Sequence, residues 1–361
     1  MRPLSATECI SPAIERTKLV LFSPFRKGRT WKLSATAYLY CGGTQYFPAP
    51  IVYLAFIPLA HRAGGMLGVT ILCAVVLLLS AFFTWLFHLC SRLQFAFFDI
   101  VVNRGEFVAP AWRKYRSPSL RWTGFKVLAG TVLTLVCAAP IVAYVRHLIP
   151  LLKELATIKP GQPPPMQFIA AMYGGYAVVM LIFGLLFLIS SLLADFIVPS
   201  LALENTSLKE AFRRMAELIR REPGEFAIFV LLKIGLGLAA YMGSVFLWEI
   251  VFLLSTLILG AVVFGVGFLL HLAGVPQILL IVLGVFLAIS WYLFALIYSM
   301  MLAIGPGFTF LEAYSLYFLG GRYPMLGDLL DQSTPPPPIP AAYPAPLPYP
   351  SYPPPPPQAI P

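Results

Sequence analysis

Residues 226–270 read FAIFVLLKIGLGLAAYMGSVFLWEIVFLLSTLILGAVVFGVGFLL, and only Lys233 and Glu249 among these 45 residues are charged. A helix needs about 20 predominantly apolar residues to cross the hydrocarbon core of a bilayer. This stretch is about twice that length. It therefore predicts two consecutive transmembrane helices, 225–243 and 245–270, with a turn at Gly243-Ser244.

Four further stretches meet the same criterion, namely residues 66–90, 124–148, 167–198 and 278–304. Over the whole chain of 361 residues, 59% are hydrophobic and 11% are charged. A soluble domain carries about 25% charged residues. A chain this apolar has to place its side chains in lipid. We therefore expect an all-α integral membrane protein, a bundle of about six transmembrane helices.

Residues 46–60 are also apolar, but Pro48, Pro50 and Pro58 interrupt them. The segment is short for a span, and apolar segments of about 10–14 residues more often form re-entrant or interfacial structures. A cytoplasmic N-terminus would require one extra crossing here. The sequence leaves three alternatives open: a short seventh span, a re-entrant hairpin, or an N-terminus on the outer face.

The two ends of the chain differ from its apolar middle. Residues 1–45 form a basic N-terminal arm, residues 46–320 the transmembrane helical domain, and residues 321–361 a proline-rich disordered tail. In the tail, 15 of residues 335–361 are proline. Such a tract favours extended, solvated polyproline II. It serves either as a spacer or as a ligand for a protein partner with a proline-recognising groove.

The net charge of +10 raises the alternative of nucleic-acid binding, but the positions of the charges argue against it. Seven of the 25 Lys and Arg residues lie in 1–33, seven in 91–126 and five in 199–225. This is the distribution of cytoplasmic loops between spans, beside anionic lipid. Since three spans follow residue 225 in the six-span prediction, the tail is expected outside the cytoplasm.

An amphipathic basic helix is predicted after Pro199. Ser207 and Glu210 have the spacing of a capping box at its start, and Pro223-Gly224 ends it. Apolar residues recur at helical spacing behind this cap, as in a helix that lies in the membrane surface. The candidate contacts with surface lipid are Lys209, Arg213, Arg214, Arg220 and Arg221.

Ionisable residues within spans are costly and are the default candidates for function. Asp195 lies near the end of the third span, and Lys233 lies about two turns into the fourth. They form a candidate intramembrane polar pair. The alternatives are separate snorkelling groups, a structural ion pair, or part of a solute or proton path. Glu249, His88 and His271 are expected near the membrane interfaces.

The sequence predicts no catalytic, cofactor-binding or metal site, and no cofactor. Catalysis needs positioned acids, bases or metals, and the four histidines are not accompanied by clustered carboxylates. The five cysteines are scattered without C-x-x-C spacing, so they indicate neither a zinc site nor a disulfide framework. We therefore expect a protein that is not an enzyme.

Several short motifs occur in order over residues 20–330. They are Phe22-Ser23-Pro24-Phe25 with Trp31, Phe97-Phe98-Asp99-Ile100-Val101, Pro110-Ala111-Trp112-Arg113-Lys114-Tyr115-Arg116, Asp195-Phe196-Ile197-Val198-Pro199, Ala211-Phe212-Arg213, Glu222-Pro223-Gly224-Glu225-Phe226 and Tyr314-Ser315-Leu316-Tyr317-Phe318-Leu319. With these motifs the chain resembles a family of uncharacterised bacterial multi-pass membrane proteins, a domain of unknown function. That family is distantly similar in pattern to the membrane domains of glycerophosphoryl diester phosphodiesterases. The resemblance implies a multi-pass protein of the bacterial cytoplasmic (inner) membrane. It carries no phosphodiesterase activity, because the soluble phosphodiesterase domain has no counterpart in this sequence.

Two functions fit these observations. The first is a non-enzymatic membrane scaffold, assembly or envelope-interaction factor, because the chain combines a basic surface helix and a proline-rich tail with little polar chemistry in its spans. The second is a transporter or channel for a small solute or ion. Transporters tend to show repeats with broken helices around a midplane site. Here the proline and glycine interruptions are not matched between the two halves of the chain.

Overall fold

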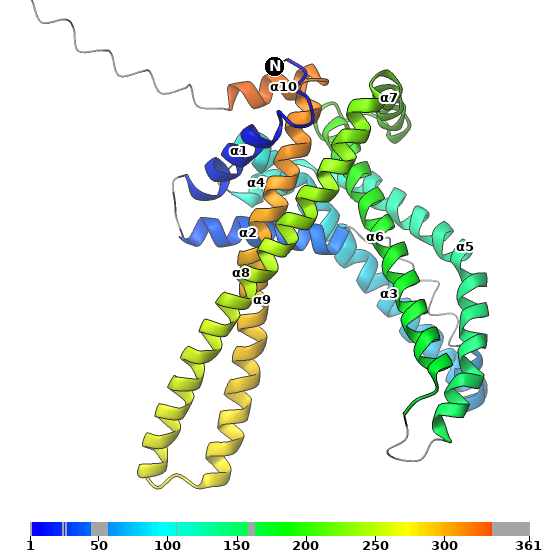
Figure 1. Cartoon of the computed structure of the whole chain (residues 1–361), viewed down its shortest axis with the longest axis vertical. Helices are drawn as coiled ribbons and strands as arrows, with labels where there is room; N and C mark the ends of the chain where they lie inside the picture. Colours follow the sequence, from blue (N-terminus) through cyan, green and yellow to red (C-terminus); the bar gives the residue numbers. More distant parts are fainter. Residues whose placement is uncertain are drawn as a thin grey trace, which may run out of the picture.

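The computed structural model describes residues 2–23, 25, 27–44, 57–105, 107–157 and 163–333, and each regular element in these ranges is a helix. Figure 1 shows their arrangement. In chain order they are α1 (Ile10–Phe22), α2 (Lys27–Thr44), α3 (Ile57–Asn103), α4 (Val108–Lys114), α5 (Arg116–Ala156), α6 (Met166–Leu203), α7 (Leu208–Arg221), α8 (Pro223–Leu272), α9 (Gln277–Gly320) and α10 (Pro324–Gln332).

Five helices in the described ranges, namely α3, α5, α6, α8 and α9, are long and apolar enough to cross a membrane. The predicted all-helical membrane architecture therefore agrees with the structure, whereas the predicted count of six spans is not confirmed. The predicted spans 66–90, 124–148, 167–198 and 278–304 fall within α3, α5, α6 and α9. The structure differs from the prediction at residues 226–270, where two spans were predicted.

The predicted turn at Gly243-Ser244 is wrong, because α8 continues through it as one helix of 50 residues. Glycine inside a helix costs only about 1 kcal/mol relative to alanine, so it does not by itself end one. Ser244, the second residue of the predicted turn, packs against α9 instead. A Cβ on Gly307 of α9 would lie 3.3 Å from Ser244 Oγ, which shows that α8 and α9 approach closely at Ser244.

The turn between the two helices comes about 30 residues later, where stronger stop signals occur. Gly274 has a φ of +80°, which glycine adopts without strain, and Pro276 immediately precedes α9. At about 1.5 Å per residue, α8 is roughly 75 Å long. This exceeds a hydrocarbon core of about 30 Å, so a steep tilt would be needed to keep the whole helix within lipid.

The helices divide into a packed head and two legs (Figure 1). We call "head" the end of the molecule where α1, α2, α4, α7 and α10 gather around the adjoining ends of α3, α5, α6, α8 and α9. The largest cluster of buried apolar side chains lies there, with members such as Phe97, Trp122, Phe229 and Tyr314. The legs are the remaining parts of α3, α5 and α6 on one side and of α8 and α9 on the other.

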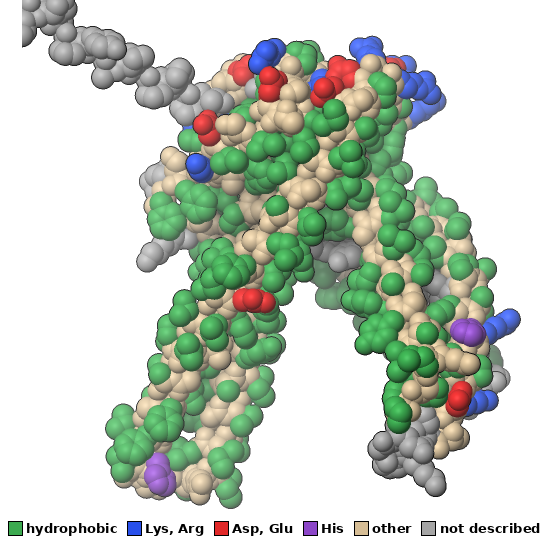
Figure 2. Space-filling model, viewed as in Figure 1, with side chains coloured by type: hydrophobic (Ala, Val, Ile, Leu, Met, Phe, Trp, Pro, Cys, Tyr) green, Lys and Arg blue, Asp and Glu red, His purple; other side chains and the backbone are tan. Residues whose placement is uncertain are grey.

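The surface of the legs is apolar. Large side chains such as Leu257, Phe264 and Phe286 are more than 60% exposed. Figure 2 shows hydrophobic side chains along both legs, while most Lys, Arg, Asp and Glu side chains on this face lie at the head. Continuous exposed apolar surface of this extent indicates contact with a membrane. The legs therefore suggest a membrane location.

The N-terminal segment is part of the head. It was predicted as a basic arm, and the structure forms α1 and α2 within it, with α2 packed against α3 and α9. Arg16 of α1 is 1% exposed. Its guanidinium donates hydrogen bonds to the carbonyl oxygens of Val101 (2.9 Å), Val102 and Ser333 (3.2 Å). Helix ends leave carbonyl groups without intrahelical hydrogen-bond partners. Arg16 donates hydrogen bonds to such carbonyl groups at the ends of both α3 and α10.

Replacing Arg16 by lysine is expected to lower the free energy of unfolding by about 1–2 kcal/mol. A single ammonium nitrogen cannot reach all the carbonyls that the planar guanidinium bridges. Thermal unfolding of the purified protein in detergent measures the loss. Lys18→Gln is the matched control, since Lys18 lies exposed on the same helix. Equal transitions for both variants would contradict the assigned role of Arg16.

The two described ends of the chain lie together. Arg16 joins α1 to Ser333, and Arg322 donates a hydrogen bond of 3.0 Å to the carbonyl of Leu4. The sequence analysis placed the tail outside the cytoplasm because three predicted spans follow residue 225. Since α8 is one helix, that inference about the tail no longer holds. The end of α10 lies at the head, with α7 and the α3–α5 connection (Figure 1). Residues 46–56 of the candidate seventh span, and tail residues 334–361, lie outside the described residues.

Candidate functional site

The structure brings Asp195 and Lys233 together, although 38 residues separate them in the chain. Asp195 lies eight residues before the end of α6 and Lys233 lies ten residues after the start of α8. The Lys233 ammonium donates to the Asp195 carboxylate, and both side chains are 6% exposed. Of the three predicted alternatives, this geometry is that of an ion pair.

Three further polar side chains lie beside the pair. Lys233 Nζ also donates to Ser315 Oγ of α9, at 3.2 Å. One turn away on α9, the carboxylate of Glu312 accepts a hydrogen bond of 2.9 Å from the Tyr40 hydroxyl of α2. Four helices therefore contribute to one polar cluster, which we define as Tyr40, Asp195, Lys233, Glu312 and Ser315.

Sequence reasoning missed Glu312 and Tyr40. A signal for Glu312 was present, since it is the only acidic residue between Glu249 and Asp328. Because the last predicted span ends at residue 304, Glu312 fell outside the predicted spans and was not considered as a charge at membrane depth. Tyr40 carried no such signal, because its hydroxyl finds Glu312 only where α2 crosses α9.

Aromatic residues lie near the ion pair along the same helices, with Phe229 one turn before Lys233 on α8 and Phe196 next to Asp195 on α6. Phe229 stacks on Phe318 with ring centroids 4.2 Å apart and on Tyr314 at 5.3 Å, and Phe196 packs edge-on against Phe229 at 5.8 Å. Dense packing keeps water away from Asp195 and Lys233. Such a pair is held by geometry and is costly to break, because an unpaired charge would then remain buried.

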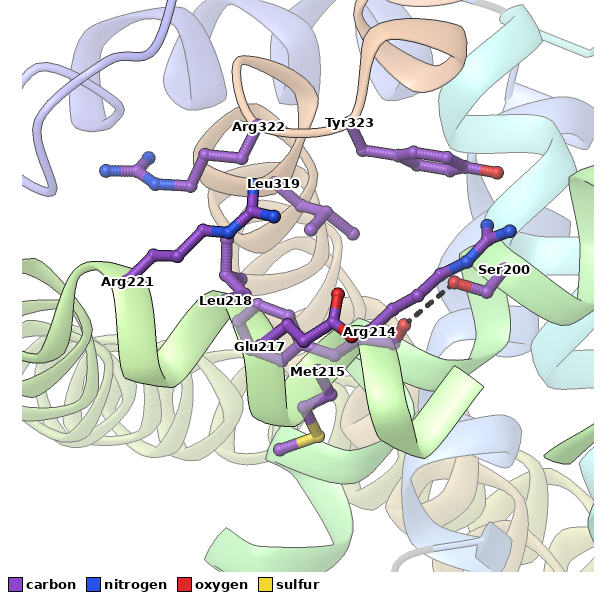
Figure 3. Close-up of a pocket in the computed structure, with 10 residues that line it drawn as sticks. Ser200, Arg214, Met215, Glu217, Leu218, Arg221, Leu319, Arg322 and Tyr323 are labelled. Carbon is purple, nitrogen blue, oxygen red and sulfur yellow. Dashed lines mark hydrogen bonds between the residues drawn. The ribbon is translucent and has the colours of Figure 1, made fainter. Parts of the chain in front are cut away.

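A separate pocket of about 280 Å³ lies where α7 meets the ends of α6 and α9 (Figure 3). Three arginines, one carboxylate and two hydroxyl groups supply its polar lining, and apolar side chains supply the rest. The lining residues are Phe196, Ser200, Arg214, Met215, Glu217, Leu218, Arg221, Leu319, Arg322 and Tyr323.

Local structure explains how α7 positions the lining. Ser207 Oγ accepts a hydrogen bond from the Glu210 amide at 3.3 Å, so the predicted N-terminal cap is present. Ala211 is fully buried, and neighbouring apolar side chains such as Phe212, Met215 and Leu218 pack against the main core. The apolar stripe of α7 is thus partly covered by protein. The prediction that α7 lies in the membrane surface stays a prediction.

Each of the five candidate lipid-contacting residues lies on or beside the polar face of α7. Arg213 pairs with Glu210 at 3.0 Å, and Arg214 pairs with Glu204 at 2.7 Å. Arg214 and Arg221 line the pocket. Lys209, Arg220 and Arg221 make no ion pair with another residue in the described part of the chain. Lipid contact by these residues stays a prediction.

Electrostatic contacts at the rim of the pocket are well defined. The Tyr323 hydroxyl donates to Glu204 at 2.5 Å, and Arg214 contacts the other oxygen of the same carboxylate. The hydrogen bond from Tyr323, and next the contact with Arg214, lower the pKa of Glu204. Burial and the Glu204 contact raise the pKa of Tyr323. The stabilisation from Glu204 is therefore present above its unfolded-state pKa and is lost as the pH falls through its lowered folded-state pKa.

The remaining candidate residues are not gathered into a site. Glu249 is exposed midway along α8, and His271 lies exposed in its last turn. His88 Nδ1 lies 3.1 Å from Thr123 Oγ1. Within the residues that the structure describes, no group of three or more His, Cys, Asp and Glu side chains has the arrangement of a metal site.

Comparison with known proteins adds the family. A family model described as "Family of unknown function (DUF7544)" matches residues 4–329, nearly the whole chain. The chain belongs to this family. The match spans the head, both legs and all the residues of the polar cluster and the pocket. Searches of curated proteins and of solved structures found no match. Membership of DUF7544 therefore supports the predicted uncharacterised family, while a bacterial origin and a similarity to phosphodiesterase membrane domains stay predictions.

Proposed function

We propose that this protein is a non-enzymatic membrane scaffold that presents its head for assembly with protein partners. The observation that carries the proposal is the state of the buried charges in the head. Asp195 and Lys233 form a buried ion pair, and the Arg16 guanidinium is hydrogen-bonded to carbonyl oxygens at the ends of α3 and α10. These groups hold helices together and leave little chemistry free for a substrate.

We further propose a bacterial cytoplasmic membrane location with the head on the cytoplasmic side. Basic residues of short loops favour that side, and the basic segments 91–126 and 199–225 both reach the head. Because the tail follows α10 at the head, it would be cytoplasmic as well. There it would be available to a partner that recognises polyproline II.

Affinity capture tests the scaffold proposal. The full chain and a chain ending at Ser333 are purified from the same membranes under mild detergent, and co-purifying proteins are compared. We expect specific partners with the full chain, and loss of those partners that bind the tail when it is removed. A protein that purifies alone in both forms would contradict the proposal.

A second candidate function, transport of a small solute or ion, is favoured by one observation. The polar cluster combines two carboxylates with one ammonium and draws on helices of both legs. Proteoliposomes loaded with a pH-sensitive dye test for a proton pathway. Proton flux that disappears in Glu312→Gln, with the variant still folded, would favour transport over the scaffold. The scaffold proposal expects no flux above that of empty liposomes.

A further inference from the structure

The pocket beside α7 contains guanidinium groups with unequal numbers of free donors. Arg322 is fully engaged, with Glu222 at 2.7 Å and with the carbonyls of Leu4 and Phe318 at 3.0 Å each. Arg214 uses Nε on Glu210 and Nη1 on Glu204, which leaves Nη2. Arg221 makes no hydrogen bond to another described residue, so its five N–H donors are available to a ligand.

The same pocket offers a carboxylate. Glu217 lines it, and its one ion-pair contact in the described part of the chain is to Arg213, at 3.6 Å. In Figure 3 the Arg221 side chain extends over Leu218 toward Leu319, and the Glu217 carboxylate lies between Arg221 and Arg214. A ligand in the pocket therefore meets a free cation and a loosely held anion side by side.

The charges near the pocket are balanced, which restricts the class of ligand. Arg213, Arg214 and Arg322 are offset by Glu204, Glu210 and Glu222, which leaves Arg221 and Glu217 among the charged lining residues. A purely anionic ligand would gain from Arg221 but would be repelled by Glu217. A ligand with an anionic and a cationic group a few bonds apart satisfies both side chains.

We propose that this pocket binds the phosphoethanolamine headgroup of a membrane phospholipid. The phosphate accepts hydrogen bonds from Arg221 and from Nη2 of Arg214, and the ammonium group donates to Glu217. Arginine suits phosphate because its donors match the phosphate oxygens. A lipid is favoured over a soluble compound because the pocket has an apolar wall of Met215, Leu218 and Leu319. It also lies at the head end of the apolar helices α6 and α9, where we expect lipid headgroups.

Native mass spectrometry of the full chain tests the proposal, with phosphatidylethanolamine, phosphatidylcholine and phosphatidylglycerol of identical acyl chains as probes. We expect phosphatidylethanolamine to bind most tightly. Arg221→Gln should weaken its binding roughly tenfold or more, the typical effect of losing a hydrogen-bonded charge pair. Arg113→Gln is the matched control, because Arg113 is an exposed arginine of α4 that does not line the pocket, and it should leave binding unchanged.

Glu217→Gln tests recognition of the ammonium group separately from recognition of the phosphate. It should remove the preference for phosphatidylethanolamine while leaving phosphatidylglycerol binding unchanged or tighter. Two results would overturn the proposal: tighter binding of phosphatidylglycerol than of phosphatidylethanolamine by the unaltered chain, or equal losses in Arg221→Gln and Arg113→Gln. Soluble O-phosphoethanolamine is the last probe. If it binds as tightly as the lipid, the ligand is the free phosphate ester and the lipid assignment is wrong.

Discussion

Replacing Asp195 by asparagine is expected to destabilise the protein by about 3–5 kcal/mol, because it removes the carboxylate that pairs directly with the buried Lys233 ammonium. Ser315 Oγ would be the remaining polar contact of Lys233 in the polar cluster, at 3.2 Å. Thermal or denaturant unfolding in detergent measures the loss, with gel filtration to detect aggregation.

The double variant Asp195→Leu with Lys233→Met should recover most of that stability. Removing both charges also removes the cost of burying them, so apolar replacement of a buried pair is often neutral or stabilising. The exposed pair of Arg213 and Glu217, 3.6 Å apart, supplies the control. Arg213→Gln should change stability by less than about 1 kcal/mol. A loss of that small size for Asp195→Asn would mean that the pair is not buried as described.

Gly305→Ala is expected to destabilise the protein by about 3 kcal/mol, the upper end of the cost of overpacking. A Cβ at Gly305 would lie 2.5 Å from Ser34 Cα and 2.6 Å from the Ser34 carbonyl oxygen. These are backbone atoms, so α2 would have to move away from α9. The shift would also separate Tyr40 from Glu312, since the same two helices carry them.

Gly284→Ala on the same helix is the matched control for this crossing. No atom lies within 4 Å of a Cβ built at Gly284. Alanine is favoured over glycine inside a helix by about 1 kcal/mol, so Gly284→Ala should be neutral or slightly stabilising. If both variants unfold at the same temperature, α2 does not cross α9 at Gly305.

The helical class and much of the span positions could be predicted from the sequence, as α3, α5, α6 and α9 illustrate. Their apolar runs are longer than a bilayer requires and are bounded by basic or proline-rich segments. The prediction failed at α8 because length was taken to imply a turn. Gly243 and Ser244 are weak stop signals, and Ser244 contacts α9 at Gly307.

The candidate sites were predictable only in part. Asp195 and Lys233 were identified because charges in apolar helices are rare, but their partner Ser315 lies 82 residues from Lys233. Likewise, the basic face of α7 was visible in its spacing. Arg221 and Glu217 line a pocket, whereas Arg220 does not. This difference follows from how α7 docks on α6 and α9.

The sequence by itself determined the properties that depend on a few neighbouring residues: the helical spans, the Ser207 cap of α7 and the basic and proline-rich ends of the chain. Apolar length and capping act within one helix, so no distant residue is needed to specify them. Only the tertiary structure decided that α8 is continuous, that the arm belongs to the head, and that Asp195 meets Lys233. The physical reason is that these features depend on the close approach of separate helices, where side-chain volume and buried charge determine which contacts form.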